Sequence, residues 1–156
     1  MGSGKTTVGQ LLATDLHIPF IDLDECIELL EEMSITEIFN QHGEAYFRKL
    51  EYELLNQIMN SEAEFVIATG GGTPCFFNQI EILNERCITI YMECKPSVLE
   101  KRLAESSQTR PILSTLPGGI QQHLNERVPI YKRAQIIVNG ELPAQELSRY
   151  IKSKLQ

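Results

Sequence analysis

Residues 2–7 of the chain read Gly2-Ser3-Gly4-Lys5-Thr6-Thr7, and the rest of the sequence is interpreted around them. A glycine turn followed by Lys and Thr is the second half of a phosphate-binding P-loop. In such a loop, backbone N–H groups and the Lys ammonium contact phosphate oxygens, while a hydroxyl joins Mg²⁺. The helix expected over about residues 6–14 would add the positive end of its dipole. The stretch therefore predicts a binding site for nucleotide phosphates.

The same stretch has three other interpretations. Gly-Ser-Gly is common in engineered leaders, although such leaders do not usually continue into Lys-Thr-Thr and an apolar helix. Met1-Gly2 with Thr6 fits a myristoylation pattern, but no polybasic segment follows to give a second anchoring signal. A glycine-rich cap on an ordinary helix is the third interpretation. Residues further along the chain must decide between them.

Part of the P-loop pattern falls outside the chain. The full pattern, G-x-x-x-x-G-K-[ST], needs a first glycine that would precede Met1, and the hydrophobic strand that feeds such a loop would precede it too. We expect the natural protein to carry this strand upstream of Met1.

Length and composition indicate a soluble globular chain. With 156 residues, 42% of them hydrophobic and 22% charged, it is long enough for one domain with its own core. A formal charge of −7 argues against general binding to nucleic acid or anionic membranes, because both depend on positive charge. No apolar run reaches the ~20 residues of a membrane span. The four cysteines show no metal-ligand spacing, so a reduced, cytoplasmic protein is expected.

Two acidic residues follow the first helix. Residues 18–24 are expected to form a short buried strand, in which the side chains of Asp22 and Asp24 would share one face. Acids at the carboxyl end of a strand beside a phosphate loop are well placed for Mg²⁺ and for a substrate hydroxyl. Asp24 could instead cap a helix that begins near Glu25.

Residues 25–60 are expected to be helical, with breaks near Met33 and at Gly43, and with a capping box at residues 34–37. Arg48 has two interpretations within this stretch. Glu44 at i−4 and Glu51 at i+3 would pair with it on a solvated helix face. The helical spacing alone favours this surface pair over a ligand-binding role.

A run of three glycines, residues 70–72, follows the next expected strand, at residues 64–69. Three consecutive glycines allow the backbone to approach a ligand closely, whereas a flexible turn needs only one or two. Further elements are expected as a helix at 76–85, a strand at 87–93, a helix from Pro96 to about residue 105, helices at 120–127 and around 131–133, a strand at 135–139 and a helix at 143–154. Residues 106–119 have the composition of a mobile loop and the length of a lid.

Taken in order, six of these elements resemble one family. They are the loop at 2–7, the Phe20-Ile-Asp-Leu-Asp24 segment, Gly43-Glu44 with Phe47-Arg48-x-x-Glu51, the glycine triplet, Arg110-Pro111-Ile112-Leu113, and Arg127-x-Pro129-x-Tyr131. The chain resembles shikimate kinases, which are P-loop kinases related in fold to nucleoside monophosphate kinases. The resemblance extends from Met1 to about Gly140.

The resemblance implies ATP-dependent phosphorylation of the 3-hydroxyl of shikimate, a step of aromatic amino-acid synthesis. It implies ATP and Mg²⁺ as cofactors, and a monomer made of one domain over residues 1–156, with substrate-binding helices at about 25–60 and a lid at about 106–119. By analogy with the family, Lys5, Asp24 and Arg110 are catalytic, and Thr6 and Asp22 hold Mg²⁺. The nucleotide would contact Gly2, Ser3, Gly4, Lys5, Thr6, Thr7, Arg102 (against adenine) and Arg110. Shikimate would contact Asp24, Arg48, Gly70, Gly71, Gly72 and Arg127, so the resemblance reverses the surface interpretation of Arg48.

The implied fold is a three-layer α/β/α arrangement around a parallel sheet of strand order 2-3-1-4-5, with the first, central strand absent from this chain. Without it, two pairs of strands separated by a gap are expected. Two alternatives to the implied activity remain. One is another small-molecule P-loop kinase such as a gluconate kinase, and the other is a catalytically impaired nucleotide-binding module with a truncated loop.

Overall fold

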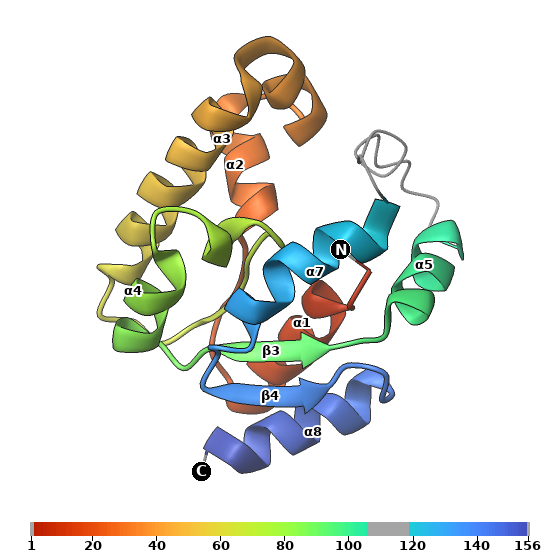
Figure 1. Ribbon diagram of the computed structural model, residues 1–156. Helices are drawn as coiled ribbons and strands as arrows, with labels where there is room; N and C mark the ends of the chain where they lie inside the picture. Colours follow the sequence, from red (N-terminus) through yellow and green to blue (C-terminus); the bar gives the residue numbers. More distant parts are fainter. Residues whose placement is uncertain (1, 106–118, 156) are drawn as a thin grey trace.

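Two separate pairs of parallel strands organise the chain in this computed structural model, which describes residues 2–105 and 119–155 (Figure 1). The first pair joins β1 (Phe20–Asp22) to β2 (Val66–Ala68), with Phe20 opposite Val66. The second joins β3 (Ile90–Glu93) to β4 (Ile136–Asn139), with Ile90 opposite Ile136. The expectation of two strand pairs is confirmed for the described residues.

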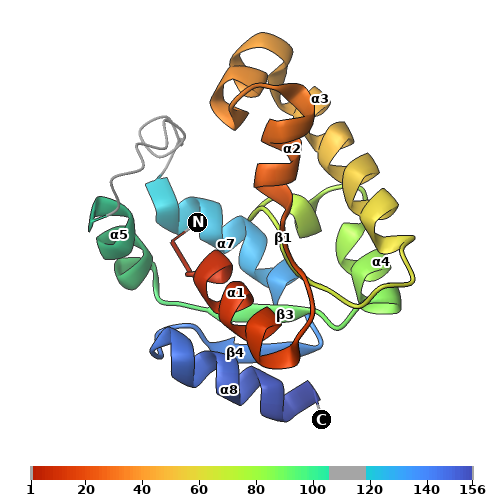
Figure 2. The same ribbon diagram turned by 180° about the vertical axis from the view of Figure 1, so that it is seen from behind.

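Helices connect and cover these strands, so the fold is mixed α/β. The view from behind in Figure 2 places α1 beside the strands, with α8 along β4. The helices are α1 (Lys5–Leu16), α2 (Leu23–Glu31), α3 (Ile35–Met59), α4 (Gln79–Arg86), α5 (Pro96–Glu105), α7 (Gly119–Tyr131) and α8 (Ala144–Leu155), with a 3₁₀ turn, η1, at Thr73–Cys75. Within the described ranges, no helix is long and apolar enough to cross a membrane.

The buried apolar side chains form two clusters. One lies between α2, α3 and α4 and includes Leu23, Ile27 and Leu55, each fully buried. The other joins α1, β4 and α8 through Val8, Val138 and other residues. Of β2, Ile67 packs against the first cluster and Val66 against the second. Burial of this apolar area is the main force that holds the helices to the strands.

Local signals place most helix ends. Ser34 caps α3, and its hydroxyl and Glu37 form the expected capping box. Gly43, with φ 80° and ψ 171°, breaks α3 where a break is expected, and α5 begins at Pro96, where its missing N–H is not needed. A helix break expected at Pro129 is wrong, because α7 continues through this residue to Tyr131.

The expected strand over residues 18–24 is wrong at its end. The strand β1 stops at Asp22, whose carboxylate accepts a hydrogen bond from the Asp24 backbone N–H and caps α2. Asp24 therefore lies in the first turn of a helix and not on one strand face with Asp22. A carboxylate at an N-cap satisfies a backbone donor that the helix leaves unpaired, and this favours starting the helix early.

A cavity of about 740 Å³ lies between the two strand pairs. Its apolar wall includes Val66 and Ile67 of β2 and Ile90 and Met92 of β3. At the carboxyl ends of the strands, the same cavity reaches the loops that carry the polar residues described next.

Candidate active site

The phosphate loop leads directly into α1. Gly4 is the N-cap residue, with φ 85°, a left-handed conformation that glycine adopts without steric cost. Gly4 has no side chain with which to cap the helix, and the first turn of α1 holds no acidic residue. The N–H groups of the first turn therefore point to the place where an anion would bind, and Lys5 adds positive charge there.

Thr6 and Asp22 meet at the carboxyl end of β1. The Thr6 hydroxyl donates a hydrogen bond of 2.8 Å to Asp22 Oδ2, while Asp22 Oδ1 accepts from the backbone of Asp24. These hydroxyl and carboxylate oxygens are hard ligands of the kind that Mg²⁺ prefers. No cluster of three or more His, Cys, Asp or Glu side chains suited to a metal occurs among residues 2–105 and 119–155. Thr6 and Asp22 thus suit a cation such as Mg²⁺, which takes few ligands from the protein and most of them from water and phosphate oxygens.

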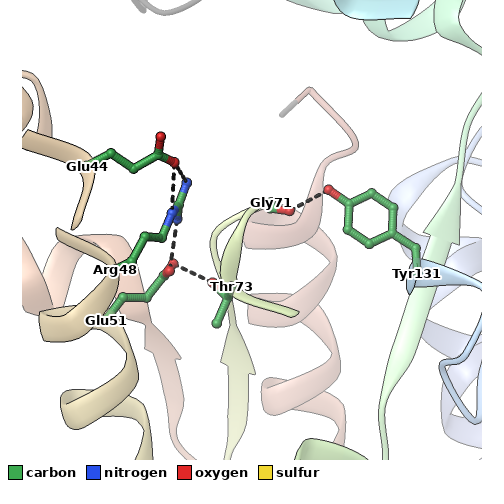
Figure 3. A network of polar contacts seen from close by, with 6 residues as sticks. All are labelled: Glu44, Arg48, Glu51, Gly71, Thr73 and Tyr131. Carbon is green, nitrogen blue, oxygen red and sulfur yellow. Dashed lines mark hydrogen bonds and ion pairs between the residues drawn. The ribbon is translucent and has the colours of Figure 1, made fainter. Parts of the chain in front are cut away.

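Arg48 pairs with both of the glutamates expected for a surface position, but it is buried. Its Nη1 donates to Glu51 Oε2 at 2.9 Å, and its Nε and Nη2 donate to Glu44 Oε1 (Figure 3). Only 8% of Arg48 is exposed, and its guanidinium lies 4.6 Å from the centre of the Phe76 ring and 5.0 Å from that of Phe47. The interpretation as a solvated helix face is therefore wrong for Arg48.

Glu51 holds Arg48 in place from within the protein. Its side chain is 2% exposed, and its second oxygen accepts a hydrogen bond of 2.5 Å from the Thr73 hydroxyl. Burial raises the pKa of Glu51, and the hydrogen bond from Thr73 and the charge of Arg48 lower it. A buried carboxylate with donors on both oxygens is the arrangement that makes a buried charge tolerable.

The glycine triplet lies against these side chains. A Cβ at Gly70 would come 2.7 Å from Glu51 Oε1 and 3.2 Å from Asp24 Oδ1, so both carboxylates border the triplet. At its other side, the Tyr131 hydroxyl donates a short hydrogen bond to the Gly71 carbonyl (Figure 3). The triplet therefore joins the first strand pair to α7.

Lys5, Gly70, Gly71 and Arg127 all line the same cavity. Arg48 and Arg127 also act on one neighbour: burial raises the pKa of the Cys75 thiol, and the charges of Arg127 and Arg48 offset part of this rise. One space is thus lined both by residues expected to contact the nucleotide and by residues expected to contact the substrate. This space could hold a phosphate donor and a small anionic acceptor together.

Arg102 connects the phosphate loop to the second strand pair. Its Nη1 donates to the carbonyl oxygens of Ser3, at 3.3 Å, and Gly140, at 3.1 Å, and lies 3.8 Å from Cys94 Sγ. Thr7 lies in the first turn of α1. Arg110 and the expected lid at 106–119 fall outside the described residues except for Gly119.

Two residues of this network are absent from the sequence-based site. Thr73 follows the triplet immediately, but a lone Thr in a turn carries no signal of its role. Tyr131 belongs to the Arg127-x-Pro129-x-Tyr131 motif, and its position four residues after Arg127 on one helix face was the available signal.

Comparisons with known proteins identify the chain. A family model described as "Shikimate kinase" matches residues 1–156. Shikimate kinase from Bacteroides fragilis is 44% identical over 142 residues, which cover 88% of this chain and 79% of the relative. Shikimate kinase from Aquifex aeolicus is 39% identical over 156 residues, which cover 100% of this chain and 92% of the relative.

Solved structures agree with these matches. Shikimate kinase from Bacteroides thetaiotaomicron superposes with a TM-score of 0.92 at 37% identity, covering 99% of this chain and 93% of that one. Shikimate kinase from Acinetobacter baumannii, solved in complex with shikimate, has a TM-score of 0.90 at 31% identity and covers 99% and 88%.

A Gly-Lys-Thr loop at the start of a helix, beside parallel strands that carry an acid at their carboxyl end, is typical of P-loop enzymes that bind nucleotides. The family match makes this more specific. The chain belongs to the shikimate kinase family, and its activity is that of a shikimate kinase.

Proposed function

We propose that this chain transfers the terminal phosphoryl group of ATP to the 3-hydroxyl of shikimate in the cavity that Lys5, Gly71 and Arg127 line together. That shared cavity is the observation that carries the proposal. Lys5, at the start of α1, lines it where phosphates are expected, and Gly70, which packs against the buried Glu51, lines it where a carboxylate is expected. The relative from Acinetobacter baumannii, solved with shikimate, supports this choice of acceptor.

The nucleotide would bind along Gly2–Thr7. Backbone N–H groups and the Lys5 ammonium would contact the phosphates and stabilise the charge on the transferring group. Arg102 holds the Ser3 carbonyl and thereby this loop, and its guanidinium would also lie against the adenine. Arg110, which lies outside the described residues, is proposed to reach the transferring phosphates.

Thr6 and Asp22 would hold Mg²⁺, with Asp22 acting through water. When bound, the ion would neutralise charge on the nucleotide phosphates. The hydrogen bond between Thr6 and Asp22 holds the Thr6 hydroxyl next to the Asp22 carboxylate. The two groups that would hold Mg²⁺ are therefore already in position before the ion binds.

Asp24 would contact the reacting hydroxyl. Its carboxylate borders Gly70, and its position at the start of α2 is fixed by the cap that Asp22 forms. Two roles remain open for Asp24, as general base or as the residue that orients the hydroxyl, since a loose transition state needs little proton transfer.

The carboxylate of shikimate would bind between Arg48 and Arg127. Two negative partners already surround Arg48, so its charge is largely compensated, and its contribution would be geometric: a fixed fork of N–H donors for a planar carboxylate. Arg127 would supply net positive charge from α7.

The two strand pairs support a finer proposal about the fold. We infer a three-layer α/β/α domain over residues 1–156 whose strands follow the family order 2-3-1-4-5, in which the pair β1–β2 takes positions 2 and 3 and the pair β3–β4 takes positions 4 and 5. The helices at about 25–60 would carry the substrate, and 106–119 would be the lid. We also propose that the protein is cytoplasmic and acts as a monomer.

A coupled assay of ADP formation by the 156-residue chain tests the function. We expect ADP formation that depends on shikimate and not on gluconate, and Asp24→Asn should nearly abolish it while leaving ATP affinity within about twofold. ATP and shikimate binding without turnover would indicate the impaired module instead. Equal loss of turnover and of ATP affinity in Asp24→Asn would contradict the role given to Asp24.

A further inference from the structure

Tyr131 is the residue of the Arg127-x-Pro129-x-Tyr131 motif for which the proposed reaction gives no role. It lies four residues after Arg127 in α7, so both side chains leave the same helix face. Its ring also packs against Tyr91 of β3, with 5.3 Å between ring centres. The hydroxyl of Tyr131 is therefore carried by a ring that two elements hold in place.

The Tyr131 hydroxyl completes a set of hydrogen bonds to the glycine triplet. The Gly70 carbonyl accepts from the Thr73 N–H at 3.2 Å, and the Gly72 carbonyl accepts from the Cys75 N–H at 2.8 Å. The Gly71 carbonyl accepts from Tyr131 (Figure 3). All three carbonyl groups of the triplet are thus engaged by the protein itself.

The N–H groups of the triplet behave differently. Among the described residues, no hydrogen bond engages the N–H of Gly71 or Gly72. A trans peptide points its C=O and N–H in opposite directions, so a donor that fixes the Gly71 carbonyl also fixes where the Gly72 N–H points. In the same way, the Thr73 N–H binds the Gly70 carbonyl and so fixes where the Gly71 N–H points. The triplet therefore presents two oriented donors, and Gly71 lines the cavity.

We propose that Tyr131 is a positioning residue of the shikimate site: by holding the Gly71 carbonyl it aims the Gly72 N–H at the substrate and keeps this donor in register with Arg127. This rests on the proposed function, in which Gly71 and Arg127 contact shikimate. Burial raises the pKa of the Tyr131 hydroxyl by more than the Arg127 guanidinium lowers it, so the phenol stays protonated and able to donate at neutral pH.

Tyr131→Phe removes this donor and keeps the ring, and Tyr91→Phe is the matched control on the neighbouring ring. Calorimetric titration of each variant with shikimate and with ATP separates the two sites. We expect Tyr131→Phe to weaken shikimate affinity roughly tenfold, because the part-buried Gly71 carbonyl loses the donor that holds its peptide in place, with ATP affinity within about twofold. Tyr91→Phe should leave both affinities within about twofold.

A second measurement reports the geometry without any ligand. The backbone amide resonances of Gly71 and Gly72 in an NMR spectrum of the free protein should shift in Tyr131→Phe and stay in place in Tyr91→Phe. Unchanged shikimate affinity in Tyr131→Phe, an equal loss in Tyr91→Phe, or unmoved glycine resonances would overturn the proposal. If the unsubstituted chain binds no shikimate, both the proposed function and this inference are wrong. If the unsubstituted chain and Tyr131→Phe both bind shikimate normally, only this inference is wrong.

Discussion

The guanidinium of Arg48 lies flat against Gly72, so closely that a Cβ at position 72 would come within 2.5 Å of both Cζ and Nη1. The backbone of Gly72 is ordinary, with φ −86° and ψ −26°, and any residue adopts it. Glycine is therefore required at this position for the space that it leaves to Arg48. The glycine triplet and the arginine form one packed unit.

Gly72→Ala should displace Arg48 without straining the backbone. Inserting a methyl group into a well-packed site costs about 1–3 kcal/mol, and we expect shikimate affinity to fall by roughly tenfold while ATP affinity stays nearly unchanged. Titration calorimetry with each ligand measures both. Lys49→Ala, on the same helix with a side chain that is 71% exposed, is the control and should change neither affinity. Normal shikimate binding by Gly72→Ala would mean that the position of Arg48 is not critical.

Glu51 makes shikimate binding depend on pH. Burial raises its pKa, so Glu51 takes up a proton above the usual range for glutamate as the pH falls, and it then holds Arg48 less well. Shikimate affinity should decrease as the pH falls through this raised pKa. The free energy of unfolding depends on pH in the opposite direction. Protonation of Glu51 favours the folded state, so its contribution to stability is full below the ordinary glutamate pKa and is lost as the pH rises through the raised pKa.

Thr73 sets the position of that transition. Its hydrogen bond favours the ionised form of Glu51 and lowers the pKa. Thr73→Val should therefore move the midpoint of the affinity profile to higher pH, while Thr73→Ser, which keeps a hydroxyl, should leave it near that of the unsubstituted chain. Shikimate titrations across pH compare the three proteins. Coincident midpoints for Thr73→Val and Thr73→Ser would exclude this control of Glu51.

Asp22→Asn should raise the Mg²⁺ concentration needed for half-maximal ADP formation by roughly tenfold, because groups that orient metal ligands typically contribute that much to metal affinity. Asp15 is a matched control. It accepts a hydrogen bond of 2.9 Å from the Ser148 hydroxyl, much as Asp22 accepts one from Thr6, but it lies near the far end of α1. An equal effect of Asp15→Asn, or no effect of Asp22→Asn, would argue against a metal role for Asp22.

Patterns within one or two turns of chain predicted much of the fold. The capping box at Ser34, the break at Gly43 and the start of α5 at Pro96 depend on residues a few positions apart, and the structure has all three. The separation into two strand pairs and the shikimate kinase family were also predicted from the sequence. These features needed only local signals or the order of motifs along the chain.

Other features depend on packing between distant segments. The surface interpretation of Arg48 failed because its burial comes from Phe76 and Gly72, which are more than twenty positions away in the sequence. The bond between Tyr131 and Gly71 joins residues 60 positions apart. The early end of β1 at Asp22 has a local cause, because the Asp22 side chain caps α2, a role that the sequence pattern allowed for Asp24.

The sequence by itself determined which chemical groups this protein has and in what order they come: a phosphate loop, acids, arginines and a glycine triplet. Only the tertiary structure decided which of these groups are buried and which donors remain for a ligand. The physical reason is that the cost of burying a charge, and the direction of a peptide N–H, depend on neighbours brought together by folding.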